Sequence, residues 1–195
     1  MKKILLIIAF ILLTTSVYAE KVVATYTMSG AKRNIEAGID RKGALNVFIQ
    51  VVGEYSDYVM IQVAGEADIN KFRTQLAYCK NKFIEWEQVA KHNNVSDFKK
   101  EIDARFPNVE VWWVGLEWYS SDKKNFIKPC FFVNDGDAAF GTYGLARHWA
   151  NDFIDQEFYI LFESAYEIQT LINALDIAKI KNALNQEKEK DALFR

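Results

Sequence analysis

Two kinds of apolar spacing follow one another along the chain, and their order constrains the fold more than any other feature of the sequence. Apolar and polar residues alternate in the stretches 22–28, 35–39, 45–51 and 59–63. Alternation is typical of strands with one buried face, whereas steps of three and four are typical of a helix buried along one side. The helical steps join Ile69, Phe72, Leu76, Cys79, Phe83, Trp86 and Ala90. We therefore expect an antiparallel four-stranded meander and then an amphipathic helix over about residues 67–92.

The same order of patterns recurs in the second half of the chain. The segments that align are 28–35 with 119–126, 39–45 with 133–139, and 59–76 with 158–175. A lone four-stranded sheet has unprotected edges and a small core, and pairing two copies relieves both problems. The sequence thus predicts an α+β fold of two pseudo-repeated ββββα units, each an antiparallel meander sheet covered by an amphipathic helix. The units span 20–92 and 109–195 and form one compact body.

A short helical connector is expected between the units, over residues 93–108. Ser96 is placed to cap a helix that runs through Arg105, with Phe98 and Ile102 on one side, and Pro107 would end it. The connector has apolar anchors and no Gly/Ser run, which predicts packed structure rather than a flexible linker.

The second helix carries two local signals. Ser164 and Glu167 have the spacing of a capping box at its start. Farther along, the apolar face that contains Leu171 and Leu175 gives way to one that contains Ile177 and Ile180. This rotation predicts a kink or a second partner surface where one face gives way to the other.

The first nineteen residues have the pattern of a secretory signal peptide. Lys2 and Lys3 precede the apolar run 4–13, and Val17-Tyr18-Ala19 places small side chains where signal peptidase reads them. We expect cleavage after Ala19 and export to a bacterial periplasm or the exterior, with no membrane span in the processed chain. The alternative is an N-terminal membrane anchor, for which the run is short.

Charge and cysteine content fit that compartment. Lys and Arg number 24 against 26 Asp and Glu, for a net charge of −2, and removal of Lys2 and Lys3 makes it −4. No general attraction to polyanions is expected. An exported protein could join Cys79 to Cys130, but Cys79 lies in the helical stripe, which favours two buried thiols.

Candidate binding residues gather where the second unit departs from the first. A short insertion around 146–155 contains Arg147, His148, Trp149 and Asp152, which combine a cation, planar rings and an acceptor. We expect a recognition loop there, or else a loop folded over the sheet and anchored by Trp149 and Phe153. The segment 109–119, interpreted as one strand, has aromatic residues on both faces, which predicts a thick core or exposed rings for stacking. The candidate binding residues are Trp113, Tyr119, Tyr143, Arg147, His148, Trp149 and Asp152.

Basic residues recur at one hairpin of both units. Lys32 and Arg33 align with Lys123 and Lys124. Two basic tips could grip an anionic partner, although solvated turn residues have the same composition.

Motifs for familiar catalytic chemistry are missing from the sequence. It has no nucleophile elbow, zinc-protease motif, P-loop or dinucleotide-binding glycine pattern, and His92 and His148 are its only histidines. The segment 134–137 has calcium-like composition but fits a hairpin turn better. We therefore predict no catalytic residues, no metal site and no cofactor.

In element order, a tandem ββββα repeat resembles the Whirly single-stranded-DNA-binding domains. The resemblance covers most of the chain after the signal and matches no motif, so it implies a fold but transfers no functional residue. It implies single-stranded nucleic-acid binding, and the export signal and the negative charge both argue against that role.

Three functional hypotheses follow. The first is an exported, non-catalytic binding module for an unknown protein, peptide or glycan. The second is a single-strand nucleic-acid binder that uses the basic tips. The third is an enzyme of unrecognised type, which would need a deep pocket joining His148 to an acidic side chain with a shifted pKa.

Overall fold

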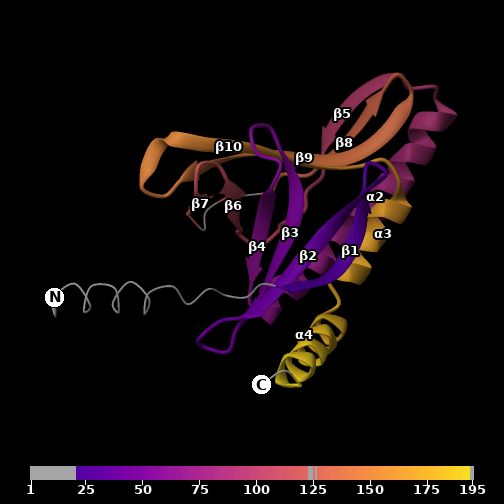
Figure 1. Ribbon diagram of the computed structural model, residues 1–195. Coiled ribbons are helices and arrows are strands. Elements are labelled where there is room, and N and C mark those ends of the chain that lie inside the picture. The colour runs from indigo at the N-terminus through magenta and orange to yellow at the C-terminus, as the bar shows by residue number, and fades with distance from the viewer. Residues whose placement is uncertain (1–20, 123–124, 126, 194–195) are drawn as a thin grey trace, which may run out of the picture.

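The computed structural model describes residues 21–122, 125 and 127–193 (Figure 1); the side chains of Asp152 and Asp191 are outside this description. The expected signal peptide, 1–19, therefore lies outside the described residues. The described residues fold into one large antiparallel sheet with three helices, an α+β architecture. The strands are β1 (Lys21–Met28), β2 (Ala31–Ile39), β3 (Leu45–Gly53), β4 (Val59–Ala64), β5 (Asp97–Glu101), β6 (Glu110–Val114), β7 (Trp118–Ser120), β8 (Cys130–Asn134), β9 (Asp137–His148) and β10 (Asn151–Phe162). The helices are α2 (Glu66–His92), α3 (Ala165–Ala174) and α4 (Ile177–Ala192).

The first meander and its helix form as predicted. Strands β1 to β4 pair in sequence order, each antiparallel to the next, and α2 follows directly. The predicted stripe on α2 is buried except for Trp86, which is half-buried. The turn between β1 and β2 falls at Ser29 and Gly30, both at positive φ, where glycine is the residue without a steric penalty.

The second half adds strands to the same sheet rather than forming a separate one. The strand order is β5-β8-β9-β10-β3-β4-β6-β7, with β2 and then β1 branching from β3. The two halves join where Phe158 and Tyr159 of β10 pair with Gly53 and Val52 of β3. A Cβ at Gly53 would lie 2.4 Å from the Val59 side chain, so this joint requires glycine.

The expected helical connector is wrong. Residues 97–101 form strand β5, which pairs with β8 from Asp97↔Asn134 to Glu101↔Cys130. Its sequence, DFKKE, points Phe98 and Lys100 to one side and Lys99 to the other, so tertiary pairing overrides the helix signals that begin at Ser96.

Two other segments also differ from expectation. Residues 109–119 are not one strand, because the chain turns at 115–117 and β7 pairs back on β6, with Val114 opposite Trp118. The expected recognition loop at 146–155 is instead the end of a long β9–β10 hairpin, with Trp149 and Ala150 at its turn. Paired backbone amides hold both segments in strand form.

Helix α3, which follows the strands of the second half, packs against the first half. α3 lies against β1, where Thr27 N–H donates to Thr170 Oγ1 at 3.0 Å. The buried Glu167 carboxylate accepts from the N–H groups of Gly30 and Glu163, both at 2.8 Å. Ser164 caps α3 by accepting from the Glu167 N–H, as predicted. Because α3 contacts the first half, the pseudo-repeat with one helix covering each sheet is not confirmed.

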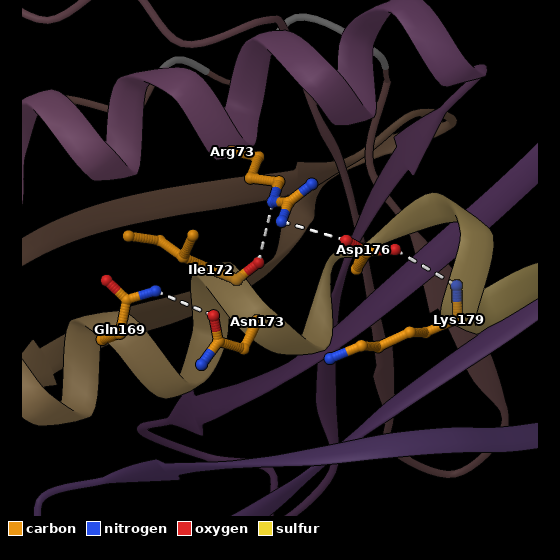
Figure 2. A network of polar contacts seen from close by, with 6 residues as sticks. All are labelled: Arg73, Gln169, Ile172, Asn173, Asp176 and Lys179. Atoms are coloured by element: carbon orange, nitrogen blue, oxygen red, sulfur yellow. Dashed lines mark hydrogen bonds and ion pairs between the residues drawn. The ribbon is translucent and has the colours of Figure 1, made fainter.

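The predicted kink lies at Leu175 and Asp176, where α3 ends and α4 begins. Figure 2 shows that Arg73 of α2 donates to the Ile172 carbonyl at 3.0 Å and to the Asp176 carboxylate at 3.1 Å. The Lys179 N–H also donates to Asp176, which places this carboxylate as the cap of α4. The kink therefore has a partner on α2.

Cys79 and Cys130 are both buried and unbonded to each other. Burial raises the pKa of the Cys79 thiol to about 12. Within the described residues, no helix combines the length and apolar character needed to cross a lipid bilayer.

Replacement of Asp176 tests the kink. The hydrogen bond from the Lys179 backbone, together with the Arg73 charge, lowers the pKa of Asp176. A lowered folded-state pKa stabilises the fold above the unfolded-state pKa, and this contribution is lost as pH falls through the folded-state value. Asp176→Ala should destabilise the protein by about 0.5–2 kcal/mol, the range for a lost cap, and Asp176→Asn, which keeps an acceptor, by less. Urea unfolding at pH 7 and pH 3 measures the free energy of unfolding of both variants and of the unchanged protein. Equal losses for the Asn variant at both pH values would contradict the assignment.

Candidate functional site

The β8–β9–β10 part of the sheet has two unlike faces. Phe131 of β8 contacts the rings of Phe83 and Trp86 on α2, and the pairs Phe131↔Phe140 and Phe140↔Phe162 keep these rings on one side. We call this side, which is turned to the helices, the inner face. The outer face carries the alternate residues of the same strands.

Register places several exposed side chains together on the outer face of the β9–β10 hairpin. Tyr143 lies opposite Tyr159, and Leu145 lies opposite Glu157. Nearer the turn, Trp149 and Phe153 are 70% and 96% exposed. In Figure 1 the hairpin runs away from the helices and ends beside β6 and β7. We call these exposed apolar residues the aromatic surface: Tyr143, Leu145, Trp149, Phe153 and Tyr159.

Carboxylates stand beside the aromatic surface. Glu54, in the β3–β4 turn, donates its N–H to the Glu157 carbonyl at 3.1 Å, which brings their side chains together. Hydrogen bonding to Glu157 raises the pKa of Glu54, and hydrogen bonds from Tyr143 and Glu54 lower the pKa of Glu157. The negative charge of Glu54 raises the pKa of the neighbouring Tyr55.

The end of the hairpin packs against β7. The Trp149 N–H donates to the Ser120 carbonyl at 3.2 Å, and the His148 ring lies 5.5 Å from the Tyr119 ring. An open hollow of about 430 Å³ is lined here by Asp122, Asn125, Leu145, Arg147, His148 and Trp149. His148 Nδ1 is shielded from solvent and has no hydrogen-bond partner among the described residues.

The structure brings together part of the predicted binding set. Tyr143, Arg147 and Trp149 are exposed on one hairpin, and His148 is half-buried next to them. Trp113 is instead 3% exposed and packs on Tyr119, so it contributes to the core. The Asp152 side chain lies outside the described part of the structure.

The structure describes only two of the four residues predicted to form the basic tips. Lys32 and Arg33 lie within β2, beyond the turn at Ser29 and Gly30, and only Lys32 is fully exposed. Lys123 and Lys124 fall outside the described residues. The structure thus assembles no pair of basic tips.

Sequence reasoning missed the residues that give this surface its charge. Glu54, Tyr55 and Glu157 were not singled out, although the alternation of Phe158, Ile160 and Phe162 already implied that Glu157 and Tyr159 point the opposite way. Glu54 and Tyr55 lie in a turn, and only the β10–β3 pairing brings them to this face. No group of three potential metal ligands occurs among the described side chains.

Glu157→Gln tests the electrostatics of the surface. Hydrogen bonding to Glu157, with burial and the negative charge of Glu157, raises the pKa of Tyr143 to about 12. Removing the charge should move that pKa back toward 10.0, its unperturbed value. A ¹³C NMR titration of the tyrosine ring carbons measures it, with Tyr143→Phe assigning the signal.

Asp155→Asn is the matched control for this titration. Asp155 is also an outer-face carboxylate on β10, but it does not perturb Tyr143. A pKa of Tyr143 that is unmoved by Glu157→Gln, or moved equally by Asp155→Asn, would contradict the described geometry.

Comparison with known proteins adds no relative. No protein-family model, curated protein or solved structure matches this chain.

Proposed function

We propose that the protein is an exported, non-catalytic binding module whose aromatic surface holds a polypeptide segment bearing basic side chains. The observation that carries the proposal is the exposure of Trp149 and Phe153 at the end of the hairpin that extends away from the helices. Large exposed rings gathered in one place are typical of interaction sites, since a soluble chain otherwise buries them.

The expected ligands were a protein, a peptide or a glycan. The negative charge beside the aromatic surface favours a polypeptide with basic side chains. Glu54 and Glu157 stand beside Tyr143, and Asp155 adds its negative charge near Tyr55. An Arg or Lys side chain can stack on a tyrosine ring while its charge meets a carboxylate. A neutral glycan would use the rings but gain little from the carboxylates.

The other two functional hypotheses receive less support. The phosphates of a nucleic acid would meet the carboxylates of Glu54, Asp155 and Glu157, which repel them. An enzyme that used His148 would need a shifted acid beside it. Among the described residues, the carboxyl groups with a shifted pKa are Glu54, Glu85, Glu157 and Asp176, and none of them lines the hollow that contains His148.

The export step and the duplication belong to the same proposal. Export rests on the signal pattern at 1–19. Duplication is supported by strand order, because β5-β8-β9-β10 is a run of antiparallel neighbours followed by α3, as β1-β2-β3-β4 is followed by α2. This correspondence moves the start of the second copy from the expected residue 109 to β5 and makes β6 and β7 an insertion, so it replaces the expected alignment of 28–35 with 119–126.

Selection from a random peptide display library on the processed protein tests the ligand class. Selected peptides should be rich in Arg and Lys, and their binding should weaken as salt is raised. Trp149→Ala and Phe153→Ala should each weaken binding at least about tenfold, the effect of losing an interface anchor.

Tyr166→Ala is the matched control, because Tyr166 is 73% exposed but lies on α3. Selected peptides without basic residues, or peptides whose binding survives both hairpin substitutions, would overturn the proposal. Binding of neutral oligosaccharides in a glycan array, with no peptide selected, would replace the polypeptide by a glycan.

A further inference from the structure

Strand β5 ends the sheet with an unpaired edge. It pairs with β8 on one side, and within the described chain no strand pairs with its other side. All five of its residues are exposed. Unpaired edge amides and carbonyls are a template for another strand.

The backbone groups that face outward can be identified. The Ser96 carbonyl accepts from Gly136 at 3.1 Å, and the Ile102 N–H donates to Pro129 at 2.8 Å, so both turn toward β8 and its hairpin. Donor and acceptor directions alternate along an antiparallel strand. Asp97, Lys99 and Glu101 therefore direct their N–H and C=O groups to the open side.

An apolar hollow lies under this edge on the inner face. It has a volume of about 380 Å³ between the end of α2 and β5. Phe98, 46% exposed, stands at its mouth, and Lys100 lies over the Trp86 ring at 4.5 Å. The apolar residues that line it are Trp86, Val89, Ala90, Val95, Phe98 and Phe131.

We propose that β5 pairs antiparallel with β5 of a second copy of this chain, about a twofold axis that passes between the two Phe98 residues. The sheet then continues from one copy into the next. The two Phe98 rings meet on the inner face. The ring of each copy covers the mouth of the apolar hollow of the other copy and displaces solvent from it.

The charge pattern selects this register over its neighbours. With Phe98 opposite Phe98, each Asp97 lies opposite a Lys99 of the other copy, on the outer face. A shift that centres the axis on Lys99 sets Asp97 opposite Glu101 and Lys99 opposite Lys99. A shift to Lys100 sets two lysines together beside the hollow. Of these three registers, only the one centred on Phe98 pairs opposite charges and places no like charges opposite each other.

Lysine on an edge strand ordinarily discourages pairing with other strands. Here the lysine selects the partner strand. A strand of another protein would need an acidic residue opposite Lys99, whereas a second copy of this chain supplies Asp97 there. The axis is perpendicular to the sheet, so both outer faces point the same way. The pair therefore presents two aromatic surfaces on one side, which goes beyond the single-site binding proposed above.

Charge exchange across the axis tests the pairing. Sedimentation velocity of the processed protein over a concentration series should show a monomer–dimer equilibrium. Asp97→Lys and Lys99→Asp should each weaken the dimer about tenfold, since each creates two like-charge pairs. The double variant Asp97→Lys/Lys99→Asp should restore it. Glu101→Lys, on the same strand and face, should leave it unchanged because Glu101 lies opposite Val95 in this register.

Cross-linking gives an independent test of the axis. Residues at a pair without hydrogen bonds have Cα atoms about 4.5 Å apart, close enough for a disulfide. Phe98→Cys should form a disulfide-linked dimer on mild oxidation, and Lys100→Cys should not. Cys79 and Cys130 are buried and do not compete.

A monomer at every concentration would overturn the proposal, as would failure of the double variant to recover. Preferential cross-linking through Lys100→Cys would also overturn it. Peptide binding at the aromatic surface is measured separately, so loss of the dimer without loss of peptide binding rejects this inference alone.

Discussion

The seating of the β1–β2 turn on the start of α3 is the contact on which the rest of the structure depends. The Glu167 carboxylate is buried and accepts from the N–H groups of Gly30 and Glu163, and Ser29 Oγ donates to the Leu161 carbonyl at 3.1 Å. A buried carboxylate is tolerated only when such donors satisfy it. This contact fixes α3 against β1, and the Arg73–Asp176 pair then fixes α2 beside α3. Both helices are thereby committed to the inner face.

The functional proposals are consequences of that one-sided arrangement. No described helix covers the outer face of the β9–β10 hairpin, so Tyr143 remains in solvent beside Glu54 and Glu157, and Trp149 and Phe153 are exposed near the turn of the same hairpin. Because α2 stops beside β5 without covering its edge, Phe98 and the outward amides of that strand remain available. A binding surface and a pairing edge thus arise from the same packing.

Local pattern was enough to predict the elements whose neighbours in space are neighbours in sequence. β1 to β4 pair in order, α2 buries its own stripe, and the change of apolar face at Leu175 marks the break before α4. The failures are at long-range pairings. Residues 97–101 have helix signals but become a strand because β8 lies beside them, and Trp113 is buried because β6 turns back at Gly115. Trp149 and Tyr143 were predicted as binding residues because candidate residues gather where the second half departs from the first, although the segment was expected to be a loop. Glu54 and Tyr55 reach the site only through the short β10–β3 joint, which no local pattern encodes.

The two halves are interlocked through these contacts and should unfold as one cooperative unit. Hydrogen exchange measured by mass spectrometry across a urea series tests it most directly, because it reports the opening of each strand separately. The amides of β2 and β3 and those of β8 and β9 should lose protection at the same urea concentration, since α3 and β1 tie the halves together. Loss of protection in one half while the other stays protected would show that the two halves unfold independently.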